Sequence, residues 1–267
     1  MSSFNQILND IKSVKIQGAT NIAKAGLKAL KLQSDATSIR KILNTRPTEP
    51  CLQNAVKYAK TTNTDVAHHF LNSLQKRTTL IGESIIKNNS TIFTHCHSST
   101  VIDILAKSKE HNKNFEVFCT ETRPLLQGRK TARDLNRLKI KTTCIADSAS
   151  HDFLKESDIF LLGADQITKD GEIINKIGSA LFAEIAYNHK VPLYICTNAW
   201  KYSEKNLKIE ERNPNEIWDQ DLKYVTVENP AFGKINQKYI KGIISELGIL
   251  PVKKFLKQVK KTYPWIQ

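Results

Sequence analysis

The chain has 267 residues, 40% of them hydrophobic, and carries a formal net charge of +14. This length suits one large domain or two smaller ones, each with a buried core. No apolar run approaches the roughly 20 residues that a membrane span needs, and the N-terminus lacks the basic and apolar blocks of a secretory signal. We therefore expect a cytoplasmic protein with no membrane partner.

The positive charge is compatible with an anionic substrate, an acidic partner or nucleic acid. No basic residues interleave with aromatic ones as they do in single-strand binders, so nucleic-acid binding ranks last. Five cysteines are spread singly, and this odd number argues against a disulfide framework. The densest basic patch has the spacing of the solvent face of a helix and comprises Lys253, Lys254, Lys257, Lys260 and Lys261.

Residues 1–88 are predicted to form a helical domain. Apolar residues recur at helical spacing from residue 11 to residue 30, interrupted around Gln17-Gly18-Ala19-Thr20. The segment Thr45–Pro50 ends the next helix, because proline cannot continue one. Two further amphipathic stretches follow, around Leu52–Ala59 and Ala67–Ile86.

Residues 89–267 are predicted to form a second domain, in which short apolar strands alternate with helices. This alternation is typical of right-handed βαβ units and a mostly parallel sheet. We therefore expect an α/β protein with a helical N-terminal domain packed on a Rossmann-like C-terminal domain. The predicted strands are Thr91–Cys96, Phe115–Thr120, Thr142–Ala146, Ile159–Gly163, Leu193–Thr197 and Tyr224–Val227, and the predicted helices include Ser99–Glu110, Thr131–Leu138 and Ser179–His189.

Cys96 follows the first predicted strand and precedes Ser98 and Ser99, which are good helix N-cap residues. A helix N-terminus lowers the pKa of a thiol, which suits a base or a nucleophile, and the same amides suit a phosphate. A structural cysteine is the plainer interpretation. His95 and His97 flank Cys96, and strand alternation would point both imidazoles one way. No third ligand is evident nearby, so we predict no metal site.

Other polar residues follow the predicted strands at the same sheet edge. Asp165 ends the apolar run Ile159–Ala164, where a carboxyl group can act as a general acid or base or simply cap a turn. Asn175–Ser179 is predicted as a loop-to-helix junction suited to phosphate. Lys201 lies past another strand, and Arg46 is able to make a bidentate phosphate contact. Taken singly, Lys201 and Arg46 are better explained as surface charges.

Five motifs occur in order along the chain: Thr94-His95-Cys96 with Ser98-Ser99, Glu121–Pro124 with Gln127-Gly128, Gly163-Ala164-Asp165, Asn175–Gly178, and Asn229–Phe232. Together they resemble one superfamily, which comprises regulatory subunits of initiation factor 2B and sugar-phosphate aldose–ketose isomerases. Within it, the chain looks most like the archaeal-type ribose-1,5-bisphosphate isomerases. Gln17-Gly18-Ala19, Thr45–Thr48 and Gly248–Pro251 also fit this branch.

The resemblance implies that a cysteine and an aspartate form the catalytic pair, which the match places on Cys96 and Asp165. Initiation factor subunits generally lack this pair, so its presence favours an enzyme. The family also implies dimers or hexamers and chemistry that needs no metal or redox cofactor. The implied substrate contacts are Gln17, Gly18, Ala19, Arg46, Ser98, Ser99, Asn175, Lys176 and Lys201.

One departure from the family pattern bears on the substrate. The isomerases have arginine immediately before Gly-Ala, where this chain has Gln17. Glutamine can donate a hydrogen bond but offers no charged fork to a phosphate. Either the second phosphate is bound differently, or the ligand carries only one.

The predicted function is isomerisation of ribose 1,5-bisphosphate to ribulose 1,5-bisphosphate by acid–base catalysis. By family analogy, nucleoside salvage would supply the substrate. The alternative is an initiation factor 2B-like subunit that binds a nucleotide or sugar phosphate without turnover. A third interpretation, methylthioribose-1-phosphate isomerase, shares the catalytic pair but is disfavoured by the short N-terminal region.

Overall fold

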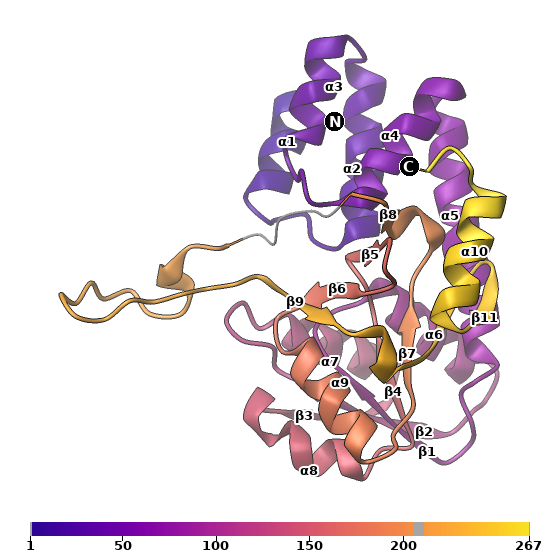
Figure 1. Cartoon of the computed structure of the whole chain (residues 1–267), viewed down its shortest axis with the longest axis vertical. Helices are drawn as coiled ribbons and strands as arrows, with labels where there is room; N and C mark the ends of the chain where they lie inside the picture. The colour runs from indigo at the N-terminus through magenta and orange to yellow at the C-terminus, as the bar shows by residue number, and fades with distance from the viewer. Residues whose placement is uncertain (1, 206–210, 267) are drawn as a thin grey trace.

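A bundle of helices comes first in the chain (Figure 1). The structure is a computed structural model that describes residues 2–205 and 211–266. In the first helix the buried residues are Phe4, Ile7, Leu8 and Ile11, the spacing of a single apolar stripe. The helices of this region are α1 (Phe4–Lys12), α2 (Ala19–Leu32), α3 (Ala36–Leu43), α4 (Pro50–Thr61) and α5 (Thr64–Glu83).

A seven-stranded sheet with the order β11-β10-β7-β4-β1-β2-β3 forms the centre of the molecule. Every neighbouring pair in it is parallel except β10 with β11. The predicted fold class, α/β with a helical N-terminal part and a mostly parallel sheet, is confirmed. The strands are β1 (Ser90–Thr94), β2 (Phe115–Thr120), β3 (Lys141–Ile145), β4 (Ile159–Leu162), β7 (Leu193–Cys196), β10 (Ile240–Ser245) and β11 (Gly248–Leu250).

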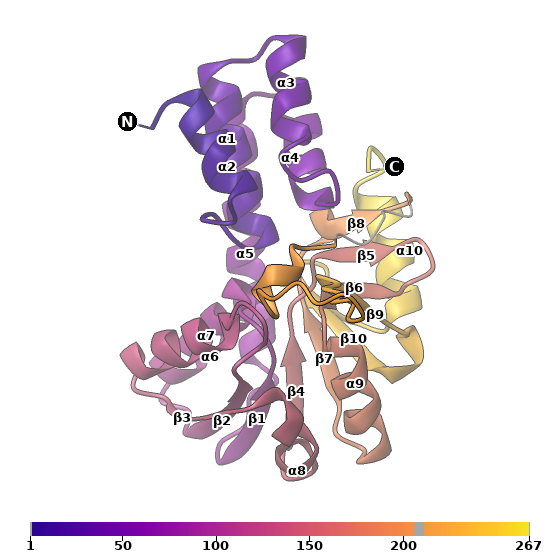
Figure 2. The ribbon, with the colours of Figure 1, turned by 90° about the vertical axis from the view of Figure 1, so that its left-hand side faces the viewer.

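Helices cover both faces of this sheet (Figure 2). Successive side chains of a strand point to opposite faces. Ile92 accordingly packs in a core with residues of α6, whereas Phe93 packs in the other core with residues of α8 and α9. Burial on both faces explains why the central strands read as continuous apolar runs. The helices are α6 (Ser99–Glu110), α7 (Gln127–Arg137), α8 (Ser150–Lys155), α9 (Ser179–Asn188) and α10 (Val252–Thr262).

A second, four-stranded sheet with the order β8-β5-β6-β9 was not expected from the sequence. Its strands are only two to four residues long, too short to show a period. Asn175 and Lys176 therefore end a strand, antiparallel to β9, rather than forming a loop-to-helix junction. The strands are β5 (Gln166–Thr168), β6 (Ile173–Lys176), β8 (Tyr202–Ser203) and β9 (Phe232–Ile235).

Residues 211–230 form an arm that extends away from the body of the molecule (Figure 1). A bridge between Glu211 and Pro230 closes its base. The strand predicted at Tyr224–Val227 lies in this arm and is wrong, because the segment pairs with no described strand and Tyr224 is 88% exposed. Its apolar and β-branched residues have the pattern of a strand, but no described strand lies beside them to pair with. The arm thus presents apolar side chains to solvent.

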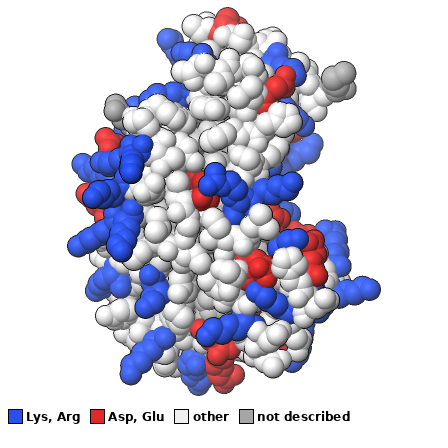
Figure 3. Space-filling model, turned by 90° about the vertical axis from the view of Figure 1, so that its right-hand side faces the viewer, with Lys and Arg blue, Asp and Glu red and all other residues white. Residues whose placement is uncertain are grey.

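The lysine-rich tail has the predicted arrangement. α10 buries Val252, Phe255 and Val259 and exposes its lysines. Lys and Arg side chains gather on the side of the molecule where α10 lies (Figure 3). Cys119 and Cys196 are buried, whereas Cys144 is exposed because β3 is an edge strand. Within residues 2–205 and 211–266, no helix combines the length and apolarity needed to span a bilayer.

Gly128, in the first turn of α7, provides a test of the packing between this helix and β2. A Cβ atom there would collide with the backbone carbonyl of Thr120, so we expect Gly128→Ala to lower the free energy of unfolding by about 3 kcal/mol. The control Gly233→Ala meets nothing closer than 3.7 Å and should change stability by less than about 0.5 kcal/mol. Urea denaturation measures both; equal stability of the two variants would contradict this packing.

Candidate active site

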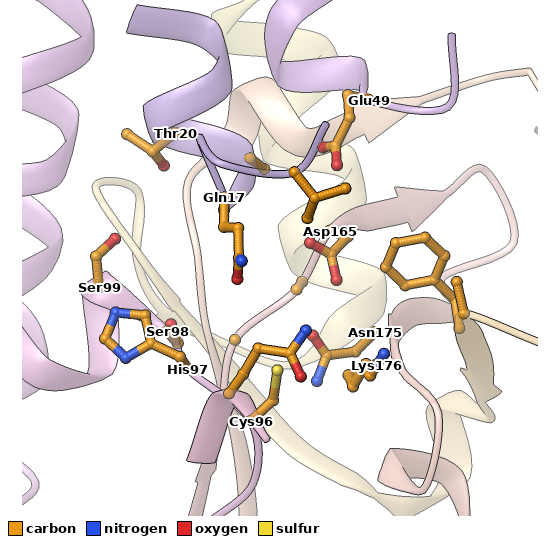
Figure 4. A pocket seen from close by; sticks show the side chains of 18 of the residues that line it. Gln17, Thr20, Glu49, Cys96, His97, Ser98, Ser99, Asp165, Asn175 and Lys176 are labelled. Carbon is orange, nitrogen blue, oxygen red and sulfur yellow. The ribbon is translucent and has the colours of Figure 1, made fainter. Parts of the chain in front are cut away.

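A pocket lies at the carboxyl ends of β1 and β4, facing the start of α2 (Figure 4). Its space is about 880 Å³, including open solvent at the mouth. The carboxyl edge of a parallel sheet is where ligands bind in open α/β folds. All the residues that the sequence predicted for the site line this pocket: Gln17, Gly18, Ala19, Arg46, Cys96, Ser98, Ser99, Asp165, Asn175, Lys176 and Lys201.

Cys96 follows the end of β1 with its backbone in the left-handed region, at a φ of 65°. Because the strand ends at Thr94, strand alternation no longer applies to the residues around the cysteine. The two histidines consequently point to different places. His95 contacts Thr120 and the Ile177 carbonyl, whereas His97 contacts Lys130 and Thr131. The expectation that both imidazoles face one way is therefore wrong.

The thiol of Cys96 is protonated in this environment. Burial above all, together with the nearby Asp165 carboxylate, raises its pKa to about 12, against the opposite effects of the His97 amide and Lys176. The prediction that a helix N-terminus lowers this pKa is wrong. The first turn of α6 is capped by Ser98, whose Oγ accepts from the Val101 amide at 3.4 Å. The loss of water around the thiol outweighs the lowering of its pKa by the His97 amide and Lys176.

Asp165 lies just beyond the end of β4, on the same side of the pocket as β6. Its backbone amide donates to the carbonyl of Ile174 at 2.9 Å, which ties the loop to the second sheet. Gly163 allows this loop to approach α6, because a Cβ atom there would lie 2.7 Å from Ser98 Oγ. Figure 4 shows the carboxyl group of Asp165 and the sulfur of Cys96 both directed into the cavity.

Two buried lysines flank the pocket. Lys201 Nζ donates to the Ala164 carbonyl at 2.6 Å, next to Asp165. Burial lowers the pKa of Lys176, while nearby Cys96 raises it. The short helix η2 (Ala199–Lys201) is clamped by Glu246, which accepts from the Ala199 amide at 3.2 Å. Buried hydrogen bonds thus position the ammonium group of Lys201.

The helical region closes the other side of the pocket. Gly18 precedes α2 at a φ of 86° and caps it without a side chain, so the first amides of this helix are not satisfied by a capping side chain. A helix N-terminus of this kind attracts anions. Thr20 lines the pocket, and its buried Oγ1 has no hydrogen-bond partner among the described residues. Arg46, in the turn before α4, brings a guanidinium to the same wall.

Sequence reasoning missed part of the lining. Gln127, Ala231 and Phe232 belong to motifs that were recognised but given no role. Glu49 and Arg212 carried no signal, since Arg212 enters the pocket from the base of the arm. Within the described chain the lining combines four cations, Arg46, Lys176, Lys201 and Arg212, with two carboxylates, Glu49 and Asp165. This surplus of positive charge suits a phosphorylated ligand.

Fold and site together define a Rossmann-like α/β protein with an anion-accepting pocket that contains a cysteine and an aspartate. The model of the initiation factor 2 subunit family matches residues 15–252. The ribose 1,5-bisphosphate isomerase of Methanocaldococcus jannaschii is 34% identical, and the match covers 100% of this chain and 97% of that protein. This chain therefore belongs to the initiation factor 2 subunit family, as the sequence motifs indicated.

Solved structures show the same fold. The translation initiation factor eIF-2B of Pyrococcus horikoshii OT3 has a TM-score of 0.81 and 28% identity, covering 99% of this chain and 98% of that chain. The 5-methylthioribose 1-phosphate isomerase of the same organism has a TM-score of 0.79 over 98% of this chain and 88% of that one. At 23% identity, this second likeness shows the fold alone.

Alkylation kinetics of Cys96 test the electrostatics of the pocket. The thiolate is the reactive form, so a thiol with its pKa raised to about 12 should react slowly near neutrality. Its rate should rise about tenfold per pH unit through the range below that pKa. Peptide mapping after iodoacetamide treatment separates Cys96 from the exposed Cys144. A Cys96 rate that levels off near pH 8 would contradict the raised pKa.

Proposed function

We propose that this chain converts ribose 1,5-bisphosphate to ribulose 1,5-bisphosphate. The observation that carries the proposal is the meeting of Cys96 and Asp165 in one cationic pocket. Full-length similarity to a ribose 1,5-bisphosphate isomerase at 34% identity supports it. In this proposal residues 89–267 form the catalytic domain, and residues 1–88 form a helical domain that closes the pocket.

Two groups of residues are suited to the two phosphates. The amides of Gly18 and Ala19 with Arg46 form one anion site on the helical side. Asn175 and Lys176 form another on the side of the second sheet. Both ends of a bisphosphate are thereby held while the sugar lies between the catalytic groups, which lowers the entropic cost of reaction.

Acid–base chemistry by the catalytic pair accounts for the isomerisation. Transfer of the Cys96 thiol proton to the Asp165 carboxylate gives the reactive form of the pair. Protonated Asp165 then donates to the ring oxygen as the C1–O bond breaks, while the Cys96 thiolate removes the proton from C2. This gives a cis-phosphoenolate. The Cys96 thiol then returns a proton to C1, and Asp165 accepts the proton of the C2 hydroxyl as the ketone forms. Lys176 assists because its ammonium group favours the thiolate of Cys96.

A regulatory subunit is the second candidate. The solved eIF-2B structure, 28% identical over 99% of this chain, and Gln17 in place of a charged fork favour it. In that case the pocket binds a nucleotide or sugar phosphate without turnover. The presence of both Cys96 and Asp165 favours the enzyme.

The arm supports a homo-oligomer. Its exposed apolar side chains are Ile217, Trp218, Leu222, Tyr224 and Val225. Apolar surface of this extent on a projecting segment is typical of a protein contact. The same arm carries Arg212 into the pocket, and Arg212 pairs with Glu216. We infer that the arm packs on a second copy of this chain.

Turnover of ribose 1,5-bisphosphate tests the function. We expect wild-type protein to form ribulose 1,5-bisphosphate in a proton NMR time course. Cys96→Ser and Asp165→Asn should each lower kcat by at least about 10²–10⁴-fold, the contribution of general acid–base catalysis, while substrate binding by calorimetry persists. Binding without conversion by the wild type would instead favour the regulatory subunit.

Removal of the exposed aromatics tests the oligomer. Because buried aromatic anchors dominate interfaces, the double variant Trp218→Ser, Tyr224→Ser should weaken self-association by about tenfold or more. Sedimentation velocity across a concentration series measures this. Leu181→Ser on α9 is the control and should behave as wild type, because Leu181 is an exposed apolar residue outside the arm, at 59% against 43% for Trp218 and 88% for Tyr224. A wild-type protein that stays monomeric at all concentrations would refute the proposal.

A further inference from the structure

The backbone of Cys96 is held at both ends by side-chain hydroxyl groups. Its amide donates to Thr122 Oγ1 at 3.0 Å, and its carbonyl accepts from Thr131 Oγ1 at 2.8 Å. A left-handed conformation is disfavoured for residues with a Cβ atom. The φ of 65° at Cys96 therefore persists because these two hydrogen bonds over-determine it.

The first hydroxyl belongs to a chain of hydrogen bonds that ends at His95. Thr122 Oγ1 lies 3.1 Å from Thr120 Oγ1, which lies 2.6 Å from His95 Nδ1. The other ring nitrogen, Nε2, lies 2.9 Å from the Ile177 carbonyl. A carbonyl only accepts, so Nε2 carries the proton and Nδ1 accepts. Each group consequently donates to the next: the Cys96 amide to Thr122, the Thr122 hydroxyl to Thr120, and the Thr120 hydroxyl to Nδ1 of His95.

The second hydroxyl belongs to a shorter chain that begins at His97. Thr131 gives its one proton to the Cys96 carbonyl, so at 3.1 Å from His97 Nδ1 it accepts from that nitrogen. His97 Nε2 is then the acceptor that faces Lys130 Nζ at 2.6 Å. Burial lowers the pKa of both histidines to about 4, and the neutral rings match these proton positions.

Asp147 anchors the first chain. Its carboxylate accepts from the amides of Thr122 and Arg123 at 2.9 and 2.6 Å. Thr122 is itself left-handed, at a φ of 65°, which is an outlier for a β-branched residue. The loops after β1 and after β2 thus both contain a strained residue, and these hydrogen bonds join the two loops. We call this network of hydrogen bonds the lock. His95 extends the lock to the turn after Lys176 through the Ile177 carbonyl.

We propose that Thr122 and Thr131 are positioning residues that fix the direction of the Cys96 thiol, and that the flanking histidines act through them. This proposal rests on the proposed function for its catalytic consequence, since Cys96 is the base in that reaction. The lock occupies both the amide and the carbonyl of Cys96. Cys96 therefore acts on the substrate through its thiol group alone. In this proposal His95 and His97 hold the backbone of Cys96 in place through the threonine hydroxyl groups.

Paired substitutions separate the hydroxyl group from the bulk of the side chain. Thr122→Val and Thr131→Val keep the shape and remove the hydroxyl, whereas Thr122→Ser and Thr131→Ser keep the hydroxyl. We expect each valine variant to lose about 10–100-fold in kcat, because small misplacements of a catalytic group are costly. KM should stay within about twofold, and the serine variants should return near wild-type kcat. Thr78→Val, which removes a buried hydroxyl bonded to Leu74 in α5, is the matched control.

Alkylation of Cys96 provides a readout that does not depend on isomerase activity. The charged groups near the thiol, Asp165, Lys176 and Asp147, are unchanged in every variant. A released loop admits water, so at pH 8 the valine variants should alkylate at Cys96 up to about tenfold faster, the effect of a pKa fall of about one unit. The serine variants and Thr78→Val should match the wild type.

The two readouts distinguish failure of this proposal from failure of the function. If the wild type does not isomerise the sugar yet the valine variants alter alkylation, the function fails and the lock stands. Wild-type kcat and alkylation in both valine variants would overturn the lock. Serine variants as impaired as the valine variants would overturn it as well, once thermal melting shows that all variants are folded.

Discussion

The parallel pairing of β1 with β4 is the constraint on which the rest of the site depends. Thr94 lies opposite Leu161 in this register, so the two strands deliver their following loops to the same edge. Cys96 and Asp165 come within reach of each other for this reason, although 68 positions separate them in the chain. A slip of one residue would turn each strand's side chains to the wrong face of the sheet. Burial of Ile92 and Phe93 on opposite faces prevents such a slip.

The pocket is completed by elements outside the main sheet. The strands of the second sheet are short, and α2 contributes only its first residues. Polar contacts link these neighbouring elements: Asn54 of α4 donates to the carbonyls of Trp200 and Tyr202, and Lys201 donates to that of Ala164 in the loop after β4. Such buried hydrogen bonds cost free energy when one partner is lost. Positioning of Lys201 thus depends partly on Asn54, which does not line the pocket.

Local patterns predicted the elements that repeat a period, and motifs predicted which residues gather. The strand Phe115–Thr120 and the helix Ser99–Glu110 have the predicted bounds. The signals for both are local: the strand has alternating burial, and the helix has an N-cap at Ser98. The second sheet escaped prediction because its strands are shorter than a readable period. Tyr224–Val227 misled because β-branched and aromatic residues favour strands only where a neighbouring strand exists. Arg212 was beyond local reasoning, since only the path of the arm brings it to the pocket.

The protonation of Cys96 was mispredicted for a reason that also bears on how the site works. Proximity to a helix N-terminus argues for a thiolate, but desolvation dominates once the pocket excludes water. The same burial disfavours the ammonium form of Lys176. Each charge then depends on the other, because a thiolate and an ammonium group attract more strongly in a medium of low dielectric constant than in water. A phosphate bound beside Lys176 stabilises its ammonium form. That ammonium group in turn stabilises the thiolate of Cys96. Substrate binding and activation of the base are in this way coupled through one lysine.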